Sequence, residues 1–332
     1  MDARNSSKAE IAVDTVDSLV NCSREAAREH FCGYFPELFA LYPVQEYIQL
    51  LDSTQRGKSM YDISPRVHAF WDRVIIEWGQ EALEIYHRVT MLELMDAFSE
   101  RARQHDYPAS ILRQFRLSFA RIEKTILRNP VGAYPHDGDN FIKDFSLCRQ
   151  TAFPGGGAWV IEHCGGFARS VMFTGGIGQF FRFAWFYLFV TRGHRPLYAP
   201  HIHNELVHLH TQRERQACHL RIAEMLERHP QVKGMAGSSW LTDPALRSVS
   251  PRLRWVRDIP EANGSKYFRV GEDIDGGALT RSATRRQLYE EGKYTPTKYL
   301  NIWARKSMIA WARRVRQEGW KSLRTRDEYV RQ

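Results

Sequence analysis

The sequence predicts a mixed α+β or α/β protein in which a helical N-terminal region precedes a mixed α/β domain. Before about Pro130, apolar residues recur at steps of three and four, as in amphipathic helices, whereas after it glycine pairs bracket short apolar runs typical of strands. The chain of 332 residues is also long for one hydrophobic core, because cores stop growing at roughly 250 to 300 residues. We therefore expect a helical domain over residues 1–130 and a catalytic α/β domain with a basic C-terminal tail over residues 131–332.

Two long segments carry the helical pattern in the first domain. Ser64 is a favourable N-cap, Pro65 suits the first helical position, and apolar residues follow at helical spacing over residues 67–89, so we expect one amphipathic helix there. A second helix is expected over residues 109–128, and the Asn129-Pro130 pair ends it. The first domain is therefore expected to be mostly α-helical.

Predicted strands and helices alternate in the second domain. Strands are expected at residues 158–161, 232–240, 266–270 and 298–303, and helices at residues 139–150, 213–228, 282–291 and 306–317. Residues 204–211 fit a strand or a helix. The alternation favours an α/β arrangement.

The net charge of +9 belongs to the C-terminal tail. Residues 281–332 hold 14 Lys and Arg against 5 Asp and Glu, a difference of nine, whereas residues 1–280 hold 33 of each. A basic face of this kind could meet phosphate on a coenzyme, a carrier protein or an anionic membrane surface. Because the rest of the chain is balanced, nucleic acid is not an expected partner.

The cysteines favour a reducing compartment. They are odd in number, widely scattered and without a C-x-x-C pair, so neither a disulfide framework nor a zinc knuckle is indicated. The first ten residues carry charges and serines where a signal peptide would have an apolar core. We expect a cytoplasmic protein.

Residues 171–190 form the most aromatic run in the chain. Three glycines, Gln179 and Arg182 interrupt it and leave about eight continuous apolar residues, whereas a membrane span needs roughly 20. We expect a buried core helix. A helix lying on a membrane surface and the wall of an acyl-chain pocket are the alternatives.

Histidine is concentrated in one segment, since seven of the 13 histidines lie within residues 194–229. Imidazole binds metals or transfers protons near neutral pH, and a neighbouring carboxylate can orient the ring or join the ligands. The histidines and the carboxylate at the centre of this segment are His201, His203, Glu205, His208 and His210. An ordinary polar strand with locally paired histidines is the simplest interpretation, and a mononuclear His/carboxylate metal site is an alternative.

A di-iron centre is a further alternative. Glu205 and His208 have a Glu-x-x-His spacing that Glu84 and His87 repeat in the helical half. Di-iron carboxylate bundles use two such pairs and one more Glu from each of two other helices. The additional ligands could come from Glu77, Glu93 and Glu123.

A different function is indicated near the C-terminus by Leu288-Tyr289-Glu290, followed by Gly292 and an aromatic residue. This segment resembles the L-Y-E-x-x-G-F pattern that ends the fourth helix of GCN5-related N-acetyltransferases. The resemblance implies that Tyr289 protonates the departing coenzyme A thiolate. Here only one residue separates Glu290 from Gly292, where the family pattern has two.

The same family has a Q/R-x-x-G-x-G/A loop between a strand and a helix, which presents backbone N–H groups to pyrophosphate. Gln212 and Ala217 match the outer positions, but Arg215 replaces the central glycine. Arg213 and Arg215 could instead bind phosphate through their side chains. In this scheme residues 204–211 form the strand beside the loop. Its Glu205 or His208, with His210 nearby, would supply the general base.

Three function classes follow. The first is an acyltransferase that moves an acyl group from acyl-coenzyme A or an acyl-carrier protein to an amine on a small molecule. The second is a metal-dependent oxygenase or hydrolase that uses iron in the histidine cluster. The third is a binding module whose basic tail, with Trp303, Trp311 and Trp320, meets nucleic acid or anionic lipid.

Overall fold

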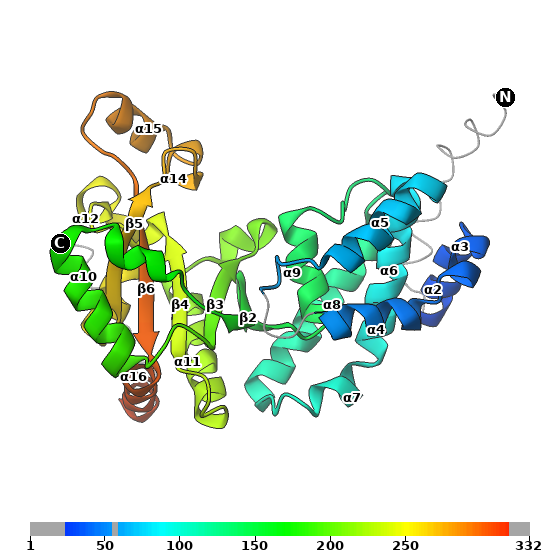
Figure 1. The fold of residues 1–332 in the computed structure, drawn as a ribbon, viewed down its shortest axis with the longest axis horizontal. Helices are drawn as coiled ribbons and strands as arrows, with labels where there is room; N and C mark the ends of the chain where they lie inside the picture. Colours follow the sequence, from blue (N-terminus) through cyan, green and yellow to red (C-terminus); the bar gives the residue numbers. More distant parts are fainter. Residues whose placement is uncertain (1–23, 55–58, 319–332) are drawn as a thin grey trace. The chain divides into compact units, whose positions relative to one another are not determined.

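The computed structural model describes residues 24–54 and 59–318 (Figure 1). The chain forms two compact units: one extends to Pro154 and includes residues 203–207, and the other holds the remaining residues from Gly155 onward. The first unit is helical and the second is built on a sheet with helices, so the fold is mixed α and β. The boundary lies later than the expected Pro130, because the helix Asp139–Cys148 packs with the helices that precede it.

The helical unit is organised around one buried helix, α6 (Gln80–Asp96), in which 13 of 17 residues are buried. Four of its neighbours pack directly on it: α2, α4, α5 and α9. The other helices of this unit are α2 (Arg24–Cys32), α3 (Pro36–Leu41), α4 (Val44–Thr54), α5 (Pro65–Trp78), α7 (Phe98–Ala102), α8 (Ala109–Arg128) and α9 (Asp139–Cys148). The predicted helix over residues 109–128 is confirmed as α8.

The single helix expected over residues 67–89 is wrong, since α5 and α6 are separate. Ser64 caps α5 as predicted, and its Oγ accepts a hydrogen bond from the Val67 N–H. Gly79 then breaks the helix with a φ of 91°, a left-handed conformation that glycine adopts without a steric penalty. The apolar spacing continues across Gly79, so periodicity alone conceals the break.

The second unit contains a six-stranded sheet in the order β1-β2-β3-β4-β6-β5. The β3/β4 pair is parallel, and the β2/β3, β4/β6 and β5/β6 pairs are antiparallel. The strands are β1 (Ala152–Gly156), β2 (Trp159–Gly165), β3 (Leu197–Ile202), β4 (Gly234–Ser239), β5 (Lys266–Glu272) and β6 (Thr297–Ala304). The strands predicted within residues 158–161, 232–240, 266–270 and 298–303 correspond to β2, β4, β5 and β6.

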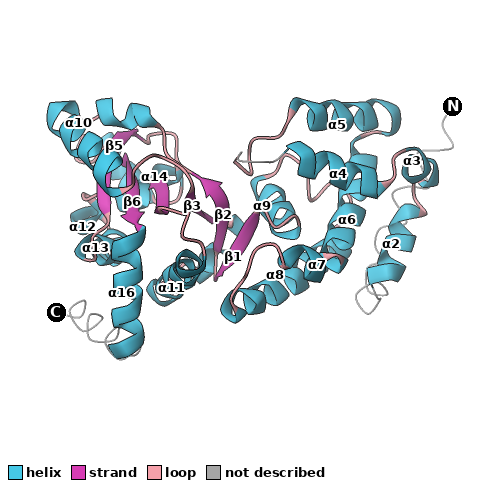
Figure 2. Cartoon of the chain, turned by 60° about the horizontal axis from the view of Figure 1, so that its bottom comes forward, coloured by secondary structure: helices cyan, strands magenta, loops and turns pink. Residues whose placement is uncertain are grey.

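Helices cover both faces of this sheet (Figure 2). The helix α10 (Gly176–Trp185), with the short η2 (Arg169–Phe173) before it and η3 (Phe186–Val190) after it, lies on one face, and α11 (Gln212–Arg228) and α16 (Arg305–Glu318) lie on the other. Between β4 and β5 the chain forms η5 (Trp240–Thr242), α12 (Leu246–Val249), η6 (Pro251–Leu253) and α13 (Trp255–Ala262), and between β5 and β6 it forms α14 (Gly277–Thr280) and α15 (Ala283–Glu290).

The strand expected at residues 204–211 in the acyltransferase scheme is wrong. Those residues form a short 3-10 helix, η4 (Asn204–Leu209), and the strand is β3, which ends before them. The Asn204 side chain donates to Asp139, and the Leu206 N–H bonds the His203 carbonyl, so the backbone turns instead of extending. The histidines at 208 and 210 therefore do not alternate on a strand face.

The buried core helix expected at residues 171–190 is also wrong in part. Phe183 and Phe186 are buried against the sheet, but Phe181 and Trp185 are 65% and 60% exposed. Within the described residues, no helix has the length and apolar character needed to cross a bilayer. The segment is a two-sided surface helix.

Candidate functional site

The candidate site lies between β3 and β4, the parallel pair of the sheet. These strands share a single pair of partners, Tyr198 and Met235, whereas β4 pairs with β6 along six residues. Pro200 follows in β3, and its nitrogen carries no hydrogen to donate to a ladder. Beyond the Tyr198/Met235 pair the β3/β4 ladder does not continue, although Pro200 still lies beside Gly237, so alternate backbone groups of β4 face β3 without a ladder pair there.

A cavity of about 210 Å³ lies here between β3 and β4. Residues from β3 and β4 form two of its sides, β2 and α11 contribute one residue each, and η5 and β6 close it. The lining residues are Trp159, Pro200, His201, Ile202, Arg215, Met235, Gly237, Ser238, Ser239, Leu241, Thr242 and Asn301. Gly237 lies beside Pro200 in this lining, where a Cβ would make ordinary van der Waals contact with the Pro200 side chain at 3.4 Å and a larger side chain would take up space in the cavity.

Arg215 gives the cavity a positive charge. Its guanidinium carbon lies 4.9 Å from the centre of the Trp159 ring, and the residue is 7% exposed. Burial lowers the Arg215 pKa, an effect that the nearby Tyr267 hydroxyl opposes. Among the described residues Arg215 forms no ion pair, and its Nε has no hydrogen-bond partner. A buried cation is costly without an anion, so this position lacks a negatively charged partner.

The first turn of α11 adds to this positive potential. The Thr211 hydroxyl caps the helix by accepting a hydrogen bond from the Glu214 N–H, and Arg215 stands in the turn that follows. The N-terminus of a 17-residue helix carries a partial positive charge from its aligned peptide dipoles. An anion beside Arg215 would therefore be stabilised by the side chain and by the helix.

A histidine–carboxylate pair joins β2 and β3, and its His201 is among the residues that line the cavity. The Nε2 atom of His201 lies 3.1 Å from a carboxylate oxygen of Glu162, which is 3% exposed. His201 pairs with Val160 across the strands, so Glu162 is its diagonal neighbour on the same face. An ionised carboxylate only accepts hydrogen bonds, so it holds the proton on Nε2 and makes Nδ1 the basic atom of the ring.

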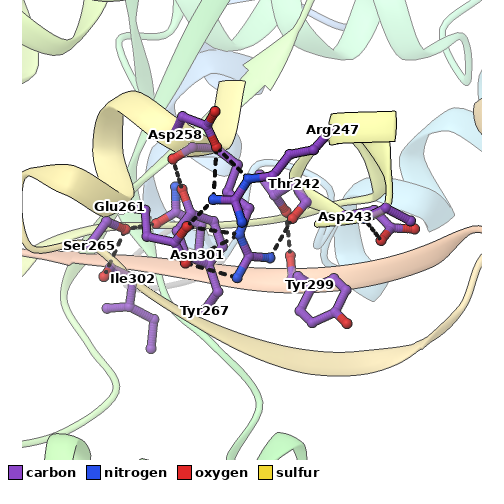
Figure 3. Close-up of polar contacts among 12 residues, drawn as sticks. Thr242, Asp243, Arg247, Asp258, Glu261, Ser265, Tyr267, Tyr299, Asn301 and Ile302 are labelled. Carbon is purple, nitrogen blue, oxygen red and sulfur yellow. Dashed lines mark hydrogen bonds and ion pairs between the residues drawn. The ribbon is translucent and has the colours of Figure 1, made fainter. Parts of the chain in front are cut away.

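The opposite wall of the cavity is held rigid by a polar network (Figure 3). The Thr242 hydroxyl contacts the Ser239 and Tyr299 carbonyl oxygens, and the Ser265 hydroxyl donates to the Asn301 side chain. Arg257 donates to the Thr242 carbonyl at 2.8 Å. These bonds tie η5, α13, β5 and β6 together, so Thr242 and Asn301 are fixed where they face the cavity.

Of the three predicted cofactor-binding residues, the structure brings only Arg215 into the cavity wall. Gln212 is half-buried at the start of α11, and Arg213 is exposed. Neither side chain lines the cavity. The different outcomes follow from the helical period, which turns Arg215 toward the sheet and Arg213 toward solvent.

The predicted general bases lie elsewhere. Glu205 is exposed and accepts a hydrogen bond from Asn140 in the helical unit, and His208 is exposed on η4. His210 lies between the rings of Trp159 and Trp255, at 5.2 and 5.3 Å between centroids. Burial, and secondarily the charge of Arg215, lower the His210 pKa to about 4, so His210 is neutral at pH 7. It stands near the cavity but does not line it.

Tyr289 does not reach the cavity either. It is half-buried on α15, in the connection from β5 to β6. The helix between β4 and β5 is α13, and the predicted strand at residues 266–270 separates it from Tyr289. The resemblance implies that the helix with Leu288-Tyr289-Glu290 follows β4. In the structure α13 follows β4, and this pattern lies in the next connection, between β5 and β6.

The residues proposed as metal ligands have other partners. Glu84 forms a buried ion pair with Arg88 and accepts the Gly132 N–H, and His87 contacts the Tyr47 hydroxyl at 3.0 Å. His203 is fully buried 3.2 Å from Asp144. Over the described ranges, no three His, Cys, Asp or Glu side chains gather so that they could hold a metal ion.

The extra Glu positions and the tail tryptophans also have defined environments. Glu93 pairs with Arg28 and Glu123 with Arg24, and Glu77 is exposed. Trp303 and Trp311 are buried in contact with each other and with His219, so they do not belong to a surface. Trp320 lies outside the described residues.

Sequence reasoning missed Glu162 and Trp159 and considered His201 only as a metal ligand. Glu162 is 39 positions from His201, and only the β2/β3 register brings them together. The sequence signal that could have found Glu162 is its position in an otherwise apolar strand, because a buried carboxylate needs a partner. Trp159 offers no such signal.

Comparison of the chain with family models, curated proteins and solved structures gave no match. The functional argument therefore depends on the geometry of the cavity.

Proposed function

We propose that this protein transfers an acyl group from a phosphopantetheine thioester, carried by coenzyme A or by a carrier protein, to an amine. The observation that carries the proposal is Arg215, a buried cation without an anionic partner among the described residues, in the wall of the cavity between β3 and β4. Phosphate is the anion that an arginine at a helix N-terminus suits best.

The unpaired backbone groups between β3 and β4 suit the rest of the donor. The pantetheine arm is an extended chain with two amides, and an extended amide chain binds naturally to unpaired strand edges. Every second residue of β4 offers its N–H and C=O toward β3 beyond Met235. The phosphate would lie at Arg215 and the arm between the strands, with the thioester directed along the cavity.

His201 and Glu162 supply the base that the reaction requires. The acceptor nitrogen attacks the thioester carbonyl carbon, a C–N bond forms and the C–S bond breaks. The proton leaves the amine for Nδ1 of His201, and the thiolate departs and then takes up a proton. Glu162 stabilises the imidazolium through its contact with Nε2 at 3.1 Å.

The resemblance to GCN5-related N-acetyltransferases supports the same assignment. It places a coenzyme-binding segment between a strand and a helix, and here β3, α11 and β4 follow in that order with Arg215 at the start of the helix. Arg215 stands at the position of the missing central glycine. Its side chain would replace backbone N–H groups as the phosphate ligand.

Thiol release tests the proposal. Purified full-length protein is supplied with octanoyl-coenzyme A or octanoyl-carrier protein and a panel of amino acids, polyamines and lysine peptides, and free thiol is measured. We expect amine-dependent release that His201→Gln abolishes and His208→Gln leaves intact. Amine-dependent release that is equal in the wild type and His201→Gln would contradict the proposed base, and no release with either donor would contradict the proposed reaction.

A further inference from the structure

The outer face of α10 and η3 is an exposed apolar surface. Its large side chains, with Phe173 at the end of η2, recur mostly at steps of three or four and are 57% to 72% exposed: Phe173, Ile177, Phe181, Trp185, Leu188 and Phe189. We call these six residues the aromatic face. Ring contacts join Phe173 to Phe180 at 5.6 Å and Trp185 to Phe189 at 6.0 Å. Soluble proteins seldom leave such a surface without a binding role.

The opposite face of this helix is already packed on the sheet. The Phe183 and Phe186 rings lie 4.8 and 6.0 Å from the Phe268 ring. The buried Gln179 side chain donates to the carbonyls of Val171 and Arg269 and accepts the Arg269 N–H. The sheet therefore already covers the opposite side of this helix, and the aromatic face is not part of the core of its own unit.

The surroundings of the aromatic face are cationic. Residues 163–204 contain four arginines and no Asp or Glu. Beyond the end of η3, His194 lies 6.3 Å from the Tyr187 ring. Partial burial lowers the His194 pKa, and the charges of Arg169, Arg195 and Lys233 lower it further. Lys233 donates to the carbonyl of Arg192 in the same turn, so the cations gather beyond the end of η3. The acidic Glu272 on the neighbouring β5 lies 3.9 Å from Arg269.

We propose that the aromatic face is the surface by which this protein lies on an anionic phospholipid bilayer. The phenylalanine, isoleucine and leucine side chains would enter the boundary between headgroups and acyl chains, where amphipathic helices of this kind bind. Trp185 suits the headgroup level. Arg169, Arg192, Arg195 and Lys233 would meet lipid phosphate, and each cation near an anionic surface adds to the attraction.

The charges around the aromatic face favour a lipid surface over a second copy of this chain as the binding partner. A two-fold interface through the aromatic face would bring the cations of residues 169–195 from both copies into one interface, because a two-fold interface uses one patch twice. No carboxylate of residues 163–204 could pair with them. An anionic bilayer satisfies the apolar face and the cations together.

Vesicle sedimentation of the full-length protein tests this inference, which is independent of the proposed acyl transfer. The probes are vesicles of phosphatidylcholine alone and vesicles containing phosphatidylglycerol. We expect binding to the anionic vesicles that weakens with salt, and a decrease of roughly tenfold or more in Phe181→Gln/Trp185→Gln. The matched control is Ile76→Gln/Leu117→Gln, which removes two side chains of the helical unit that are 82% and 61% exposed.

Three results would overturn the inference. The first is anionic-vesicle binding that Phe181→Gln/Trp185→Gln and the second pair, Leu188→Gln/Phe189→Gln, both leave unchanged. The second is no vesicle binding together with a dimer in light scattering that these pairs dissociate, which would assign the face to a second copy. The third is no vesicle binding by a monomer. Because the four side chains are exposed, both pairs should keep the wild-type melting temperature, which verifies folding.

Discussion

The guanidinium of Arg215 lies over the ring of Trp159, 4.9 Å from its centre, in the lining of the cavity between β3 and β4. The ring partly compensates for the burial of the cation, since a cation over an aromatic face gains about 0.5 to 2 kcal/mol. It does not replace an anion. This pair is the observation on which we propose that the cavity between the two strands binds a negatively charged ligand.

Replacing Arg215 should weaken ligand binding without lowering the stability of the protein. Arg215→Met keeps the packing volume and removes a buried charge, so we expect the free energy of unfolding to stay equal or to rise by about 1 to 3 kcal/mol. Urea denaturation without ligand measures this change. A loss of several kcal/mol would indicate that Arg215 is a structural residue and not a ligand-binding one.

The His201–Glu162 pair should control the rate of the proposed acyl transfer. His201→Gln should lower kcat by about 100-fold or more, and Glu162→Gln by a smaller factor, because Glu162 positions the ring and does not touch substrate. Steady-state kinetics of the two variants with octanoyl-coenzyme A and an amine measure both factors. If Glu162→Gln shifts only KM, the pair positions substrate and does not transfer a proton.

Asp144 should link the stability of the helical unit to pH. Burial alone would raise the Asp144 pKa, but hydrogen bonds and charges from Arg121 and His203 bring it to about 2, below the ordinary 3.8. The stabilisation it provides is therefore complete above about pH 4 and is lost as the pH falls toward 2. Asp144→Asn should cost about 3 to 5 kcal/mol at pH 7, because it leaves the Arg121 guanidinium without its buried carboxylate. Unfolding at pH 7 and pH 3 tests this, and a variant as stable as the wild type at pH 7 would contradict the assignment.

Metal removal should leave donor binding unchanged. His201, His203 and Glu205 each have a different partner, Glu162, Asp144 and Asn140 respectively. Metal analysis of protein purified without chelators should therefore find substoichiometric iron, manganese and zinc. Stoichiometric metal that disappears in His201→Gln would favour the metal-enzyme hypothesis.

Local periodicity was enough to predict most helices and strands. The helix at residues 109–128 has the bounds of α8, because a capped apolar stripe followed by Asn129-Pro130 specifies both ends. Periodicity could not reveal the break at Gly79, because the apolar spacing continues on both sides of that residue. It also left residues 204–211 open between a strand and a helix, and the strand of the acyltransferase scheme is replaced by a turn that the polar contacts of Asn204 with Asp139 and Asn140 favour.

The candidate site was predictable only where a residue type carried its own signal. Arg215 was proposed because it stands in place of a glycine beside a helix N-terminus, and it lines the cavity. Glu162 was not proposed, since its contact with His201 depends on strand register. The exposure of Phe181 and Trp185 was missed for a related reason: a run of aromatic residues does not reveal which of its faces the sheet covers.

The affinity for the phosphopantetheine donor tests the central claim most directly. The probe is S-octanoyl phosphopantetheine, the part that both donors share, and isothermal titration compares the wild type with Arg215→Met, Gly237→Val and Arg213→Met. We predict that Arg215→Met weakens binding about tenfold or more, as expected for the loss of a hydrogen bond to a charged group. Gly237→Val should block the cavity, and the exposed Arg213→Met should bind as the wild type does. No binding by the wild type, or equal affinity in Arg215→Met, would contradict the account.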